Sequence, residues 1–133
     1  MRLIPQFDPA DLASTAWAFA AVKYNHETFF DVLASQAIVI LDLLSVEELA
    51  DIAWSFASMQ YADGPLMTAI ASPARQKIHL FLAREISNLA WSLAKSLVSD
   101  MPLIDALSCQ ARRKISEFVP RTLANLVWSV SRL

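Results

Sequence analysis

Four tryptophans stand at a constant spacing along this chain of 133 residues. They are Trp17, Trp54, Trp91 and Trp128, and each step from one to the next is 37 positions. Each lies in a similar phrase, namely LASTAWAF at 12–19, LADIAWSF at 49–56, ISNLAWSL at 86–93 and LANLVWSV at 123–130. A fixed period of this size predicts a stack of repeated supersecondary units, because one such unit cannot bury its apolar face alone.

The residues around each tryptophan predict the first helix of a repeat. Apolar residues recur five before and two after the tryptophan, with a small or branched residue directly before it, which is a helical spacing. Asp8 before Pro9, and Ser45 with Glu48, are typical signals of a helix N-terminus. The expected first helices run roughly over 9–23, 46–60, 83–97 and from 120 to the end.

A second helix is predicted in each full repeat. Pro65 and Pro102 share one column of the repeat and suit a first helical turn. Apolar residues then step by four positions, and the expected helices run roughly over 27–41, 65–78 and 102–115. Pro73 falls inside the middle one and should kink or interrupt it, because proline lacks an N–H group and clashes one turn back.

Helix pairs in tandem predict an all-α fold, an α-α superhelix or solenoid of stacked antiparallel helix pairs. The whole chain, 1–133, is interpreted as one solenoid segment. Its expected repeats are 7–43, 44–80, 81–117 and a partial repeat over 118–133. The helix expected from residue 120 onward has no partner helix after it. This favours the interpretation that the chain is a piece of a longer array. The alternative is a small protein that dimerises through its open ends.

Composition argues against several functional classes. The chain has one cysteine, one glycine and two histidines, so it offers no cysteine cluster, phosphate-binding loop or paired-histidine metal motif. We therefore expect no cofactor, no bound metal and no enzymatic activity, and we interpret Cys109 as a small packing residue. The apolar runs are too short to span a bilayer, so no membrane partner is expected. No targeting segment is recognisable in the first residues.

Charge is distributed unevenly along the chain. Residues 1–74 carry two basic and nine acidic side chains, whereas residues 75–133 carry nine basic and four acidic ones. Arg112, Arg113 and Lys114 are consecutive. This asymmetry indicates an anionic partner for the C-terminal half, although a short basic run can also be no more than a solvated helix face. The unit 38–74 holds five acidic residues and no Lys or Arg, and should repel phosphate.

Polar positions of the first helices predict a binding stripe. Three residues before the tryptophan stand Ser14, Asp51, Asn88 and Asn125, one after it stand Ser55, Ser92 and Ser129, and four after it stand Lys95 and Arg132. Stacking brings equivalent faces together, so these columns can form a ladder that reads one RNA base per repeat. Asn can bond to a base edge, and Lys and Arg attract phosphate. Alternatively, Asn88 and Asn125 bond to the neighbouring repeat.

The tryptophan column itself is interpreted as repeat core rather than as a stacking platform. Ala and Leu surround each tryptophan at helical spacing, which is typical of a buried knob. On that interpretation, replacing one tryptophan by alanine should cost about 3–5 kcal/mol of stability.

The phrase FVPRTLANLVWSVSRL at 118–133 resembles the repeat of the octotricopeptide family. FLAREISNLAWSLAKSL at 81–97 and FDPADLASTAWAFAAV at 7–22 resemble it too, and the related heptatricopeptide repeats share the length of 37 residues. The resemblance implies an α-solenoid that binds organellar RNA and acts in transcript stabilisation, processing or translation in the mitochondrion or chloroplast. The second helices depart from the family pattern, because they lack its additional tryptophan.

Two functions follow from these observations. The leading one is binding of single-stranded RNA, such as an organellar transcript or rRNA, by a segment of an organellar gene-expression factor. The alternative is a protein–protein interaction scaffold without direct RNA contact, which the acidic second repeat favours.

Overall fold

The computed structural model describes residues 8–22, 27–59 and 64–133, and this part of the chain is all-α. Its α-helices each have 13 residues. They are α1 (Pro9–Ala21), α2 (Glu27–Val39), α3 (Val46–Ser58), α4 (Gly64–Gln76), α5 (Ala83–Lys95), α6 (Met101–Arg113) and α7 (Pro120–Arg132). Short 3-10 turns η2 (Leu41–Leu43), η3 (Ile78–Leu80) and η4 (Ile115–Glu117) follow α2, α4 and α6. The predicted fold class is confirmed.

Local capping explains where the first helices begin. The Asp8 carboxylate accepts a hydrogen bond from the Asp11 N–H at 2.8 Å, and Ser45 and Glu48 bond reciprocally at 3.2 and 2.9 Å. In α5 the Glu85 carboxylate accepts from the Leu82 N–H at 3.1 Å. Each bond satisfies an N–H that a helix start leaves without an intrahelical partner. The first helices therefore begin at the predicted residues; α1, α3 and α5 end two residues before the predicted limit, and α7 ends one residue before it.

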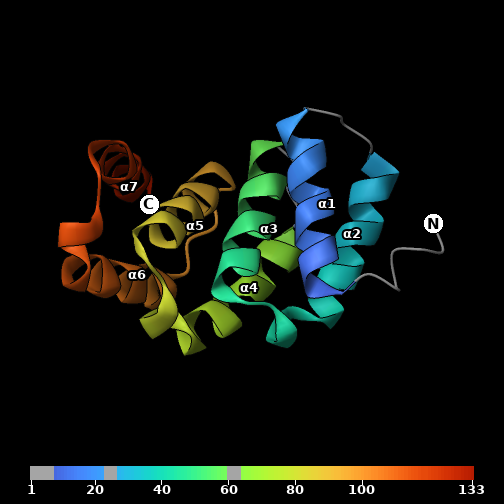
Figure 1. The fold of residues 1–133 in the computed structure, drawn as a ribbon, viewed down its shortest axis with the longest axis horizontal. Helices are drawn as coiled ribbons and strands as arrows, with labels where there is room; N and C mark the ends of the chain where they lie inside the picture. The colour runs from blue at the N-terminus through green and yellow to red at the C-terminus, as the bar shows by residue number, and fades with distance from the viewer. Residues whose placement is uncertain (1–7, 23–26, 60–63) are drawn as a thin grey trace.

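The helices form two layers. The first helices α1, α3, α5 and α7 pack against one another in chain order, while α2, α4 and α6 follow one another in the second layer (Figure 1). Buried alanines line the side of each first helix that meets the next one, including Ala16, Ala53 and Ala90. Small side chains allow close approach of helix backbones, and this packing produces the stacked helix pairs of a solenoid.

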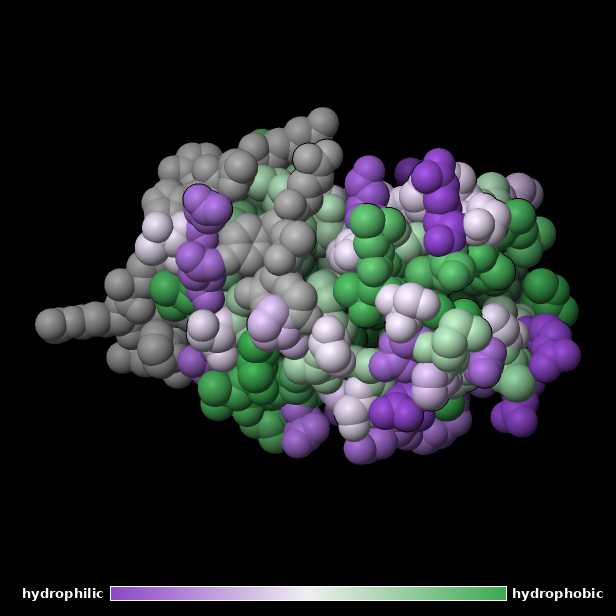
Figure 2. All heavy atoms as spheres, turned by 180° about the vertical axis from the view of Figure 1, so that it is seen from behind, coloured by the Kyte–Doolittle hydropathy of each residue, from purple (hydrophilic) through white to green (hydrophobic). Residues whose placement is uncertain are grey.

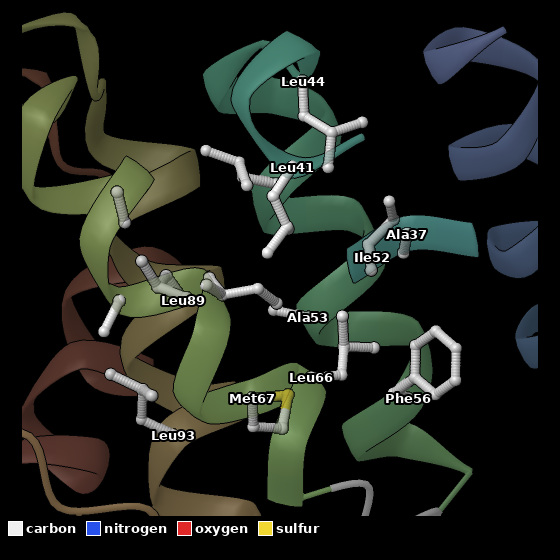
Figure 3. Packing of buried hydrophobic residues seen from close by; sticks show 14 of the residues in the cluster. Ala37, Leu41, Leu44, Ile52, Ala53, Phe56, Leu66, Met67, Leu89 and Leu93 are labelled. Atoms are coloured by element: carbon white, nitrogen blue, oxygen red, sulfur yellow. The ribbon is translucent and has the colours of Figure 1, made fainter. Parts of the chain in front are cut away.

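The hydrophobic core lies between the two layers. Phe56 of α3 lies beside Leu66 of α4, Ile52 of α3 lies beside Ala37 of α2, and Leu89 of α5 lies beside Ala53 (Figure 3). Two aromatic rings are in contact within the core. The Phe30 and Phe56 ring centroids are 5.2 Å apart at an interplanar angle of 81°. Edge-to-face packing of this kind is a favourable arrangement for buried aromatic side chains.

Pro73 does not interrupt α4, so of the two effects that the sequence predicts, a kink or an interruption, the interruption is wrong. The helix continues through it from Gly64 to Gln76, and the Pro73 side chain is buried. The Lys77 N–H donates to the Pro73 carbonyl at 3.1 Å, so the chain keeps helical hydrogen bonding past the ring. Pro73 lies in the last turn of α4, where it removes one intrahelical hydrogen bond, and its ring is buried.

The edge formed by α7 leaves apolar side chains exposed. Leu123, Val127 and Val130 occupy columns that are buried on α3 and α5, and the exposed fraction of Val127 is 62%. Figure 2 shows hydrophobic side chains at the surface of this end of the molecule, among hydrophilic ones. None of the helices in the described ranges is long and apolar enough to cross a membrane.

A buried glutamine links successive repeats and provides a test of the stack. The Gln110 amide on α6 donates to the carbonyls of His79 and Phe81 at 3.3 and 3.0 Å. Gln110→Ala should lower the free energy of unfolding by about 1–3 kcal/mol, because it removes one buried and one partly buried hydrogen bond. Urea denaturation would measure this loss. Gln76→Ala is the matched control: Gln76 is exposed on α4, so its change should stay within about 0.5 kcal/mol, and equal losses would contradict the proposed link.

Candidate nucleic-acid interface

Four columns of the first helices point away from the core. They stand seven and three positions before the tryptophan, at the tryptophan itself, and four positions after it. At 100° per residue these columns fall within about 60° of one another, on the side opposite the buried columns. We call this surface the outward face. Its residues are Ala10, Ser14, Trp17 and Ala21 on α1; Glu47, Asp51, Trp54 and Ser58 on α3; Arg84, Asn88, Trp91 and Lys95 on α5; and Arg121, Asn125, Trp128 and Arg132 on α7.

The tryptophan column is not repeat core, and that prediction is wrong. Trp17 and Trp128 are exposed, with exposed fractions of 48% and 38%, and Trp54 and Trp91 are half-buried. The ring centroids of Trp54 and Trp91 lie 6.4 Å apart at an interplanar angle of 32°. The buried large residue of each repeat stands two positions later, as Phe56 does in α3, because the core lies on the opposite side of the helix.

The serine column also differs from the prediction. Ser55, Ser92 and Ser129 are fully buried, and each hydroxyl donates to the carbonyl four residues earlier at 2.6–2.7 Å. The equivalent residue of α1, Ala18, is exposed, so this column faces the preceding first helix. The local bond satisfies the hydroxyl, which permits its burial between helices. These three serines are therefore absent from the outward face.

On α5 and α7 the outward face presents free amides and cations. Asn88 and Asn125 make no side-chain hydrogen bond within the described ranges, so they do not hold the repeats together there. Lys95 is exposed and forms no ion pair with any described residue. The Arg132 guanidinium lies 5.1 Å from the Trp128 ring centroid, which is a cation–π geometry. Both helices thus repeat the order amide, indole, cation.

On α3 the same face is acidic. Glu47 and Asp51 replace the arginine and asparagine columns, and the Arg84 guanidinium of α5 pairs with the Asp51 carboxylate at 3.0 Å. Arg84 also lies 3.5 Å from the buried Glu85 carboxylate. Ser14 on α1 is exposed but has no charged neighbour in its own stripe. Charge therefore divides the outward face, and its anion-attracting part is formed by α5 and α7.

The basic run at the end of α6 lies outside the outward face. Arg112 and Arg113 are exposed on a second-layer helix, and Lys114 pairs with Glu117 at 3.6 Å. Cys109 is also exposed on α6, which corrects its interpretation as a packing residue.

Two cations of the outward face, Arg84 and Arg121, were not among the residues that the sequence predicted. Their spacing of seven residues from the tryptophan is a signal that could have identified them, because seven residues complete almost two helical turns.

One comparison identifies the family of the chain. A family model described as RNA-editing substrate-binding complex 6 protein matches residues 1–101, which include α1 to α5. The chain belongs to this family. No curated protein matches its sequence. No group of metal-ligating side chains occurs within the described ranges of this family member.

Asp51 connects the charge of the outward face to pH. Burial raises the pKa of its carboxyl above the ordinary value of 3.8, although the neighbouring Arg84 lowers the pKa. A raised folded-state pKa means that the folded chain binds a proton more readily than the unfolded chain. Protonated Asp51 therefore stabilises the folded chain. This stabilisation is present below pH 3.8 and is lost as pH rises through the folded-state pKa of Asp51.

Asp51→Asn should strengthen binding of a polyanion to the outward face and leave stability unchanged or slightly raised at neutral pH. The change restores the amide found in this column on α5 and α7, removes a half-buried negative charge, and frees Arg84 for phosphate. We expect roughly three- to tenfold tighter binding at low salt, which corresponds to about 1 kcal/mol for one charge. Anisotropy titration and urea denaturation at pH 7 and pH 3.5 would measure both effects. The stability difference between the variant and the parent should shrink at pH 3.5. Weaker binding of single-stranded RNA, used here as the polyanion, would contradict the view that Asp51 repels phosphate at the outward face.

Proposed function

We propose that this chain binds single-stranded RNA through the outward face of α5 and α7, as part of an RNA-editing complex. The main support is the repetition of amide, indole and cation in the same order on two adjacent helices. Amides can bond to base edges, and cations attract phosphate. Membership of a family named for RNA-editing substrate binding supports the same class of ligand.

The proposed role is binding rather than catalysis, and it needs no cofactor. The resemblance of the repeats to octotricopeptide and heptatricopeptide units extends the proposal to an organellar transcript or rRNA, acting in its processing, stabilisation or translation. Of the two organelles that the resemblance implies, we propose the mitochondrion rather than the chloroplast, because the RNA-editing family favours it.

The test is a fluorescence-anisotropy titration of the full chain with a randomised single-stranded RNA pool at two salt concentrations. We expect binding that weakens as salt rises, with log affinity falling linearly with log salt, because phosphate contacts release counterions. Double-stranded DNA of matched length is the control and should bind more weakly. Absence of binding at low salt by a helical, soluble sample would contradict the proposal.

A protein scaffold is the second candidate function. The exposed Leu123, Val127 and Val130 on α7 favour it, because a contiguous apolar edge is typical of a protein contact. Partner capture with and without ribonuclease distinguishes the two functions. A partner retained after ribonuclease treatment and released in Val127→Asp would support the scaffold, whereas partners that disappear with the RNA would argue against it.

A further inference from the structure

We propose that the tryptophans of the outward face are base-stacking platforms, and that nucleobases of single-stranded RNA stack on Trp91 and Trp128. This inference rests on the proposed RNA binding. It assigns a role to the tryptophan column, because the proposed function uses only the amides and the cations of the outward face. The indoles stand between the amide and the cation on each helix, at three and four positions from them. All three side chains therefore project from the outward face within about two helical turns.

The arrangement matches the three chemical parts of a nucleotide. Lys95 or Arg132 can bind the phosphate, the indole can cover the base plane, and Asn88 or Asn125 can bond to the base edge. Protein sites for single-stranded nucleic acid combine a cationic track with aromatic platforms in this way. Trp17 and Trp54 lack the partners: Ser14 and Ala21 flank the first, and Asp51 and Ser58 flank the second.

The Trp91 indole borders the Trp54 indole of the preceding first helix. Their ring centroids are 6.4 Å apart at an interplanar angle of 32°, so the two rings are tilted rather than stacked face to face. Trp91 is half-buried, so part of its side chain stays accessible to a base.

A competing partner for Trp128 is already present in the chain. The Arg132 guanidinium lies 5.1 Å from the ring centroid, and a cation–π contact at an exposed site is weak. Stacking of a base on an aromatic side chain is the stronger interaction. The base should therefore displace the guanidinium, which then becomes available to the adjacent phosphate.

Intrinsic fluorescence gives a direct test, because the chain has four tryptophans and all of them belong to this column. The full chain is prepared as two double variants, Trp17→Phe with Trp54→Phe and Trp91→Phe with Trp128→Phe. Each is titrated with oligoadenylate and with an abasic ribose-phosphate oligomer of equal length, while anisotropy of the labelled oligomer reports binding. We expect oligoadenylate to quench the variant that keeps Trp91 and Trp128, and the abasic oligomer to bind without quenching.

Affinity supplies the second readout. Replacing Trp91 and Trp128 by alanine should weaken oligoadenylate binding by roughly 25-fold or more, about fivefold for each stack removed, and leave abasic binding within about twofold. Alanine at Trp17 and Trp54 is the matched control and should change affinity less than about twofold. Binding in anisotropy without quenching of Trp91 and Trp128 would overturn the stacking inference alone. Failure of the unmodified chain to bind either oligomer would overturn the proposed RNA binding, and the stacking inference with it.

Discussion

Reversing the charges of Lys95 and Arg132 to glutamate is expected to weaken binding of single-stranded RNA on the order of 100-fold. Each cation stands at the same column of the outward face, on adjacent helices. A hydrogen bond to a charged group contributes about 1.5–3 kcal/mol, so removing each cation from its phosphate costs about tenfold or more. The slope of log affinity against log salt should also become shallower by about 0.7 for each phosphate that is no longer neutralised. Anisotropy titration across several salt concentrations measures both quantities.

Arg112→Glu with Arg113→Glu is the matched control for this double variant. It makes the same change in net charge in the same half of the chain, but on the second-layer helix α6. We expect it to lower affinity only about two- to threefold, through the long-range field alone. If the two double variants weaken binding equally, the outward face has no special role and binding follows net charge.

Phe56→Ala is expected to lower the free energy of unfolding by about 3–5 kcal/mol. Phe56 is almost completely buried between the layers and contacts Phe30 edge-to-face, so truncation removes apolar burial and leaves a cavity. Chemical denaturation followed by far-ultraviolet circular dichroism measures the loss. The expected loss is a large share of the roughly 5–15 kcal/mol that folded domains possess, so the variant should unfold at a much lower denaturant concentration.

Trp17→Ala provides the contrast that separates core from surface. Its side chain is about half exposed, so the expected loss is only about 1–2 kcal/mol, well below that of a fully covered aromatic residue. A loss as large as that of Phe56→Ala would show that the tryptophan column is core, as the sequence alone indicates. A much smaller loss in the free energy of unfolding would show that Trp17 is not needed for the core and is available to a ligand.

The candidate site is only partly predictable from the sequence. Helical spacing predicts the asparagine column and the cations Lys95 and Arg132 on one face, and the structure places them on one face. The same spacing predicts Ser92 beside them, but Ser92 is buried, because its hydroxyl bonds to the Asn88 carbonyl and needs no water. The spacing rule alone cannot separate these cases, since the serine column lies only about 40° from the nearest outward column, and the preceding helix covers it.

The sequence by itself determined the repeat, the helices and the number of layers. The constant step of 37 residues, the capping residues such as Asp8 and Ser45, and the apolar spacing are local features, so they specify helices before any helix meets another. Only the tertiary structure decided whether the tryptophan and serine columns are buried. These columns flank the polar stripe, and the neighbouring helices cover the serines but leave the tryptophans partly exposed. Close contact through Ala53 and Ala90 places Phe56 and Leu93 inside and leaves the indoles at the surface.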